Sequence, residues 1–290
     1  MSRIQDILQK AERDGTLRRT SGAVASPSVG SAAATLTPPT PIARVPIDPA
    51  PVARHDWADA EAARSVSPAQ LAHQLVAATA PHSLAAEQYR SLRTRISRAA
   101  EGRAIRTLIV TSPAKGDGKS LTAANLALTM AQQFQQRVLL VDADLRQPTI
   151  HRLFGLAPTP GLSDVLMGSA LMNDALVTLR EHHLTVLRAG TLPTQPAELL
   201  GSVAMRQTLD RLGTQFDRIV LDMPPAVPLA DVQIALSAAD AVVMVVRAGV
   251  TPKPAIERAL AGLDRTKVLG LVLNEYGGAD AYTGYEYAAG

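Results

Sequence analysis

A glycine-containing loop, SPAKGDGKS, joins an apolar run at 107–111 to a segment of helical pattern. A Gly-rich turn between a strand and a helix exposes consecutive backbone N–H groups, which bind phosphate oxygens. Gly116 and Gly118 permit this turn. Lys119 can then reach the β- and γ-phosphates of a nucleotide, and the Ser120 hydroxyl can bind Mg²⁺. The stretch therefore predicts a phosphate-binding loop for ATP and Mg²⁺.

The loop departs from the pattern G-x-x-x-x-G-K-[ST] at one position, because Pro113 replaces the first glycine. The strand-like run before the loop and the helical pattern after it still support the assignment, since the motif requires that context. The residues expected to bind the nucleotide are Gly116, Asp117, Gly118, Lys119, Ser120, Leu121 and Asn274.

Three carboxylates follow apolar runs that are typical of buried strands. Asp142 and Asp144 come after 137–141, and Asp222 comes after 218–221. In an open α/β sheet the ligand crevice lies at the carboxyl ends of the strands, so these side chains are expected beside the phosphates. A turn that simply favours Asp is the alternative.

We expect Ser120, Asp144 and Asp222 to hold the metal ion. The catalytic candidates are Lys119, Asp142 and Asp144.

Further strand-like runs at 184–187, 241–246 and 268–273 alternate with helical patterns such as 254–263. Such alternation predicts an α/β domain with a mostly parallel sheet and helices on both faces. Asn274 ends the last run, where it could hydrogen-bond an adenine edge or cap a turn. Both roles remain open at this point.

Composition excludes several classes of function. The chain has no cysteine, so disulfides and thiol chemistry are excluded. A net charge of +3 is too small to indicate nucleic-acid binding. The longest apolar run, 241–246, is too short to cross a bilayer, and the first residues do not resemble a signal peptide. A cytoplasmic location is expected.

Four regions follow from composition and periodicity. A short amphipathic helix is expected at 1–14, and a largely disordered Pro/Ala-rich linker at 15–80. The nucleotide-binding domain should occupy 81–275. The segment 276–290 is expected to be a flexible tail. It contains four of the five tyrosines of the chain, which are Tyr276, Tyr282, Tyr285 and Tyr287.

A helical pattern at 83–96 places Glu87, Arg90 and Arg93 three residues apart, so that they lie along one helix face. Spacing alone favours a solvated charged face, because surface ion pairs of this kind are common and contribute little.

The motifs SPAKGDGKS, LLVDADLR and IVLDMPP resemble the Walker A, Walker A′ and Walker B motifs of the bacterial tyrosine kinases, which are autokinases of capsule and exopolysaccharide synthesis. The resemblance extends over about 83–290. It also includes QPTIHRLFGLAPTPGLSDVL, LPTQPAELL, the charged helix and the tyrosine-rich tail.

The resemblance implies a MinD-like P-loop fold in which Lys119 and Ser120 bind ATP·Mg²⁺. The Asp142, Asp144 and Asp222 carboxylates would hold metal or activate a tyrosine hydroxyl. It also implies a homo-oligomeric ring that forms through Glu87, Arg90 and Arg93. Transfer would occur in trans to Tyr282, Tyr285 and Tyr287, and less surely to Tyr276.

The family also implies partners. A separate membrane chain-length determinant protein would activate the kinase and recruit it to the inner face of the cell membrane, and a cognate tyrosine phosphatase would reverse the modification.

The alternative is a MinD/ParA-type ATPase that acts as a positioning switch. Those proteins carry a lysine five places before the Walker lysine, where this chain has Ala114, and Lys115 is one place away. The tyrosine-rich tail has no purpose in such a switch. A non-catalytic nucleotide-bound scaffold is a third possibility, which misplaced carboxylates would favour.

Overall fold

The computed structural model describes residues 70–99, 103–133, 136–227 and 230–275. A seven-stranded sheet lies at its centre, in the order β3-β4-β2-β5-β1-β6-β7. The strands are β1 (Thr107–Thr111), β2 (Val138–Asp142), β3 (Leu176–Leu179), β4 (Leu184–Leu187), β5 (Arg218–Asp222), β6 (Ala241–Arg247) and β7 (Val268–Asn274). All neighbouring pairs are parallel except β3 with β4. The predicted mostly parallel sheet is confirmed.

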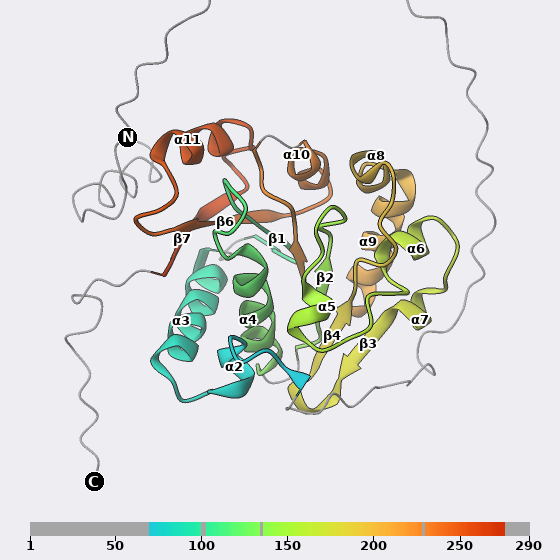
Figure 1. Cartoon of the computed structure of the whole chain (residues 1–290), viewed down its shortest axis with the longest axis horizontal. Helices are drawn as coiled ribbons and strands as arrows, with labels where there is room; N and C mark the ends of the chain where they lie inside the picture. The colour runs from blue at the N-terminus through green and yellow to red at the C-terminus, as the bar shows by residue number, and fades with distance from the viewer. Residues whose placement is uncertain (1–69, 100–102, 134–135, 228–229, 276–290) are drawn as a thin grey trace, which may run out of the picture. The chain divides into compact units, whose positions relative to one another are not determined.

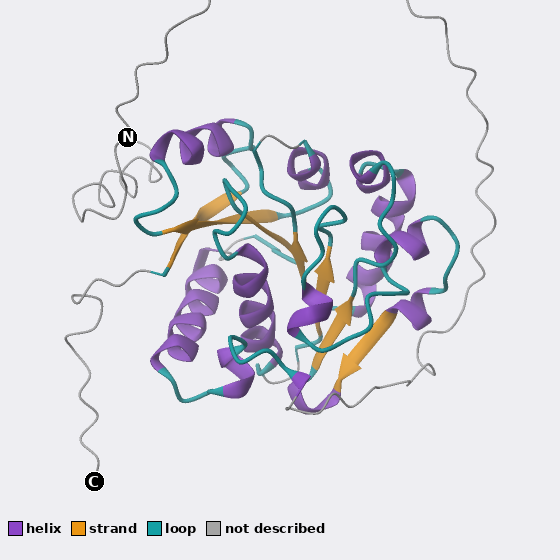
Figure 2. Ribbon diagram, in the orientation of Figure 1, coloured by secondary structure: helices purple, strands orange, loops and turns teal. Residues whose placement is uncertain are grey.

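Helices cover both faces of this sheet, as predicted. In Figure 1, α3 and α4 lie on one side of β6 and β7, and α11 lies on the other. Figure 2 shows the same arrangement by type of secondary structure. The helices are α2 (Val76–Thr79), α3 (Leu84–Ala99), α4 (Lys119–Ala131), α5 (Ile150–Leu153), α6 (Leu162–Leu166), α7 (Met172–Ala175), α8 (Pro196–Leu200), α9 (Val203–Gln215), α10 (Asp231–Leu236) and α11 (Lys253–Ala261), with a short 3₁₀ turn at Arg180–His182.

The central strands β1 and β2 are mostly apolar because helices cover both of their faces. Every residue of β1 and β2 is buried. Helix α4, which follows the phosphate loop, is buried from Thr122 to Ala131. A sheet and helix packed this tightly hold the loop between them in a fixed position.

One predicted boundary differs from the structure. Residues 71–80 were expected to belong to the linker, but Leu75 is fully buried in the core and Leu71 is 9% exposed. Asn125 of α4 accepts a hydrogen bond from the Ala77 N–H at 3.0 Å and donates to the Gln74 carbonyl at 3.0 Å. The folded domain therefore includes this segment, because α4 supplies both apolar contacts and hydrogen-bond partners for it.

Edge strand β3 was not predicted. It pairs with β4 in the antiparallel direction, with Leu176 opposite Leu187 and Leu179 opposite Leu184. An antiparallel edge strand on an otherwise parallel sheet is common.

The expected helix at 1–14, most of the expected linker and the tyrosine-rich tail lie outside the described residues. Within the described ranges, no helix combines the length and the apolar character needed to cross a membrane.

Candidate active site

The phosphate loop connects the end of β1 to the start of α4. Gly116 and Gly118 have φ values of 88° and 94°, a region that residues with a Cβ rarely adopt. Gly118 is the N-cap of α4, so Lys119 is the first helical residue. The unpaired N–H groups of the first helical turn therefore begin at the loop, as an anion site requires.

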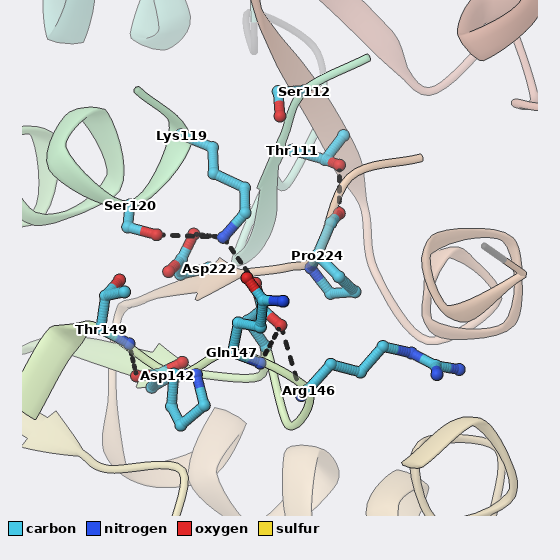
Figure 3. A network of polar contacts seen from close by, with 12 residues as sticks. Thr111, Ser112, Lys119, Ser120, Asp142, Arg146, Gln147, Thr149, Asp222 and Pro224 are labelled. Carbon is cyan, nitrogen blue, oxygen red and sulfur yellow. Dashed lines mark hydrogen bonds and ion pairs between the residues drawn. The ribbon is translucent and has the colours of Figure 1, made fainter. Parts of the chain in front are cut away.

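The Lys119 ammonium lies among the side chains that the sequence assigns to the metal. It is 2.8 Å from Asp144 Oδ2 and 3.4 Å from Asp222 Oδ1, and it donates to Ser120 Oγ at 3.0 Å. Figure 3 shows Lys119 directed toward Ser120 and Asp222. The loop, β2 and β5 thus bring their predicted residues together, so the carboxylates are not misplaced.

Asp142 is fully buried at the end of β2. Its Oδ2 accepts a hydrogen bond from the Thr149 N–H at 3.1 Å (Figure 3). The same oxygen accepts from the Ile150 N–H at 3.0 Å. Its Oδ1, like Oδ2 of Asp222, is buried without a hydrogen-bond partner among the described residues. Two buried carboxylate oxygens without a partner are acceptors that a cation or a hydroxyl donor could satisfy.

Charge is unbalanced at this site, because three carboxylates face one ammonium. Burial first, and then the charge of Asp222, raises the pKa of Asp142 well above its usual range. Burial also raises the pKa of Asp222, although Lys119 opposes the change. For Lys119, burial disfavours the charged form, but the Asp222 and Asp144 carboxylates outweigh it and raise the pKa. An excess of buried negative charge and oxygen donors fits Mg²⁺.

No group of three or more His, Asp or Glu side chains within the described ranges is arranged to hold a metal ion by itself. This is the usual situation for Mg²⁺ in phosphoryl-transfer sites, where one or two carboxylates share the ion with substrate phosphates and water. The residues present are therefore suited to a metal that enters with the nucleotide.

Three of the predicted nucleotide-binding residues have partners within the protein. Both oxygens of the Asp117 carboxylate are used, one by the Ala114 N–H at 2.9 Å and the other by the Thr251 hydroxyl at 2.7 Å. The Asn274 amide donates to the Asp117 carbonyl at 3.0 Å, a role that neither sequence alternative described. Leu121 is partly buried and packs against the core.

Sequence reasoning missed Asp231, which is fully buried at the start of α10. Its carboxylate accepts two hydrogen bonds from Arg146, at 2.9 Å from Nε and 3.3 Å from Nη2. Arg146 follows Asp144 in the LLVDADLR motif, and its N–H donates to Asp144 Oδ1 at 3.3 Å. The pair fixes the loop after β2, and no pattern around Asp231 could have revealed it.

The charged face of α3 is half-exposed to exposed. Arg90 Nε donates to Glu87 Oε2 at 2.7 Å, and Arg93 Nη1 donates to the Thr129 carbonyl at the end of α4 at 2.8 Å. These contacts are internal to the chain. Contact with a second subunit therefore stays a prediction, as do the roles of Tyr276, Tyr282, Tyr285 and Tyr287, which lie outside the described residues.

The parallel sheet and the Lys119 loop define a P-loop nucleotide-binding protein, and the model of the AAA domain family matches residues 106–264. The chain is 41% identical to tyrosine-protein kinase YwqD of Bacillus subtilis over 71% of its own length and 87% of that protein. It therefore belongs to the family of bacterial tyrosine kinases.

Two further comparisons agree with that membership. The chain is 32% identical to succinoglycan biosynthesis transport protein ExoP of Rhizobium meliloti over 77% of its own length, but spans only 28% of ExoP. The crystal structure of the chimerical protein CapA2B2 superposes with a TM-score of 0.66 at 32% identity, covering 70% of this chain and 90% of that one.

Proposed function

We propose that this chain is an ATP-dependent protein-tyrosine autokinase that regulates the polymerisation and export of exopolysaccharide or capsule. The observation that carries the proposal is the convergence of Ser120, Asp144 and Asp222 on the Lys119 ammonium, within 3.4 Å. The site belongs to a chain that is 41% identical to a tyrosine-protein kinase.

Each residue has a role that its surroundings support. Lys119 binds the β- and γ-phosphates and stabilises the charge that shifts during transfer. Asp142 accepts the proton of the attacking tyrosine through Oδ1, the oxygen that has no partner among the described residues. Ser120, Asp144 and Asp222 would hold Mg²⁺, which would supply positive charge to neutralise the phosphates.

The surroundings of Asp142 suit a general base, because burial and the charge of Asp222 raise its pKa and so strengthen the carboxylate as a proton acceptor. Asp144 has a different surrounding. Its Oδ1 accepts from the Gln147 N–H at 3.0 Å, and its Oδ2 pairs with Lys119. Both of its carboxylate oxygens therefore have partners within the site.

The acceptors are Tyr282, Tyr285 and Tyr287, together with Tyr276, and they receive phosphate in trans within a ring. The ring contact uses Glu87, which is exposed, and Arg90 and Arg93, which are partly exposed. A separate membrane chain-length determinant protein activates the kinase at the inner face of the membrane, and a cognate tyrosine phosphatase removes the phosphate. The likenesses to ExoP and to the CapA2B2 chimera support this assignment.

The test is phosphotyrosine formation by the purified chain with Mg²⁺ and ATP, mapped by mass spectrometry. Lys119→Met should abolish it. The matched control is Lys115→Met, which removes an exposed lysine of the same loop and should leave phosphotyrosine formation unchanged. ATP hydrolysis without phosphotyrosine, or strong dependence on Lys115, would instead favour the MinD/ParA-type switch.

A further inference from the structure

The turn between β6 and α11 is hydrogen-bonded to the phosphate loop through Thr251. The Thr251 Oγ1 accepts from the Arg247 backbone N–H at 2.9 Å and donates to Asp117 Oδ1 at 2.7 Å. A hydroxyl has one proton, and the carboxylate can only accept, so the direction of the second bond is fixed. Thr251 is 2% exposed and Asp117 is 3% exposed. Water therefore does not compete for this charge-assisted bond.

Asp117 occupies the position on which the shape of the loop depends. It lies between Gly116 and Gly118, the two loop glycines with positive φ. Because glycine has no Cβ, the backbone on either side of Asp117 can adopt many conformations unless side-chain contacts fix it. Its second carboxylate oxygen accepts from the Ala114 N–H at 2.9 Å, which closes the loop on itself. Its carbonyl accepts from the Asn274 amide at 3.0 Å. One residue thus connects the loop to the ends of β6 and β7.

The space around this contact is small. A Cβ added to Gly118 would lie 2.0 Å from Nδ2 of Asn274, so the loop and the end of β7 are in direct contact. Burial raises the pKa of Asp117, whereas the hydrogen bonds from Thr251 and Ala114 lower it. Since both carboxylate oxygens have protein partners, Asp117 contributes to phosphate binding through its backbone and through the shape it gives the loop.

We infer that Thr251 is a positioning residue for the nucleotide. It acts through Asp117, by fixing the N–H groups of the loop in their phosphate-binding arrangement before the nucleotide arrives. Preorganisation of this kind raises affinity because less conformational freedom is lost on binding. The inference deepens the proposed function and rests on it, since it requires that the loop binds ATP. No motif in the sequence marks Thr251, which is a single threonine before a proline.

The experiment compares the full chain with Thr251→Val, which keeps the size of the side chain and removes its hydroxyl, and with Thr251→Ser, which keeps the hydroxyl. Thr214→Val is the control, because that exposed threonine donates to the Arg211 carbonyl within α9. The probe is a fluorescent N-methylanthraniloyl derivative of ADP with Mg²⁺. We expect Thr251→Val to weaken binding about tenfold and Thr251→Ser to stay within about twofold of wild type.

Steady-state kinetics should separate positioning from chemistry. The KM for ATP should rise about tenfold in Thr251→Val while kcat changes less than about twofold, because the bond supports the loop equally in the ground and transition states. Asp117→Asn, which retains the volume of the side chain, should weaken binding in the same direction. Combining it with Thr251→Val should add little further loss, since both changes remove one interaction.

Thermal melts without nucleotide distinguish positioning from a merely structural role. If Thr251→Val lowers the Tm but binds the probe as tightly as wild type, Thr251 only stabilises the fold and the inference is overturned. Equal losses in Thr251→Ser and Thr251→Val would also overturn it, because the hydroxyl would not be the cause. Wild-type protein that binds no nucleotide would overturn the proposed function itself, which is a separate result.

Discussion

The Lys119 ammonium and the Asp144 carboxylate form a buried ion pair, with Nζ 2.8 Å from Oδ2. Lys119 is the first residue of α4, and Asp144 follows the end of β2. Their side chains are 12% and 3% exposed. Phosphates that enter the loop therefore compete with Asp144 for the lysine, while Mg²⁺ can take the place of the ammonium at the carboxylates. The ion pair thus involves the same charged groups that the proposed reaction requires.

Replacement of Lys119 by Met should affect stability as well as activity. The substitution leaves Asp142, Asp144 and Asp222 buried without their cation. Breaking one side of a buried pair costs about 3 kcal/mol, so the free energy of unfolding should fall by roughly that amount at neutral pH. Urea denaturation measures it, with Lys115→Met as the control that removes an exposed lysine. Identical unfolding curves for both variants would contradict the ion-pair geometry.

Asp142→Asn should lower activity but raise stability, whereas Lys119→Met should lower both. Autokinase activity should fall by about 100-fold or more, because Asn cannot accept the tyrosine proton. The Tm should nevertheless rise at neutral pH, since the change removes a buried negative charge that faces Asp222.

The pH dependence of that gain follows from the raised pKa of Asp142. A carboxyl whose folded-state pKa is raised binds its proton more tightly when folded, so its ionisation destabilises the fold as the pH rises. The gain from Asn should therefore be fully present above the folded pKa and shrink as the pH falls from neutral toward the ordinary carboxyl pKa of about 4. Calorimetry of both proteins across this range is the measurement. A gain that persists unchanged in acid would show that charge is not its cause.

Leu75→Ala should destabilise the domain by about 2–5 kcal/mol, because the side chain is fully buried. The matched control is Leu84→Ala, since Leu84 is 57% exposed and its loss should cost less than about 0.5 kcal/mol. Equal effects of the two variants on chemical denaturation would indicate that residues 71–80 belong to the linker and not to the folded domain.

Local pattern was enough to predict the central strands and the residues at their carboxyl ends. Asp142 and Asp222 end the apolar runs that became β2 and β5, and Lys119 begins the helix that follows the loop after β1. Buried parallel strands require such runs, and an open α/β sheet places their ends together.

Features that depend on distant contacts could not be predicted. Leu75 and Ala77 occur in a Pro/Ala-rich region, and their partner Asn125 is 48 residues from Ala77. Thr251 is 134 residues from Asp117. Strand β3 is only four residues long and follows directly on the helix α7, so it gives no signal of its own.

The charged face of α3 gives a prediction about assembly. Arg90→Ala combined with Arg93→Ala should produce monomers with weak autophosphorylation, if this face contacts a neighbouring subunit. The exposed ion pair of Arg90 with Glu87 contributes little to stability, so loss of the oligomer would not follow from unfolding. Light scattering coupled to size exclusion is the measurement, and Arg95→Ala, exposed on the same helix, is the control. An unchanged oligomer in the double variant would show that this face is a solvated surface and not a contact between subunits.

Transfer between subunits is tested by mixing two chains. A Lys119→Met chain keeps its tail tyrosines but cannot transfer phosphate, while a second chain keeps Lys119 and has Phe at Tyr282, Tyr285 and Tyr287. The tail begins directly after β7, so a short tether makes its own site hard to reach, whereas a neighbour's site in a ring is available at high effective concentration.

We therefore expect phosphotyrosine on the tail of the inactive chain when both are mixed with Mg²⁺ and ATP, and none when the inactive chain is alone. Each phosphate adds nearly two negative charges, which the excess carboxylates around Lys119 should repel, so the labelled mixture should dissociate into smaller species. Mass spectrometry locates the phosphate, and light scattering follows the dissociation. An unlabelled tail, under conditions in which wild type is strongly labelled, would show that transfer occurs within one subunit.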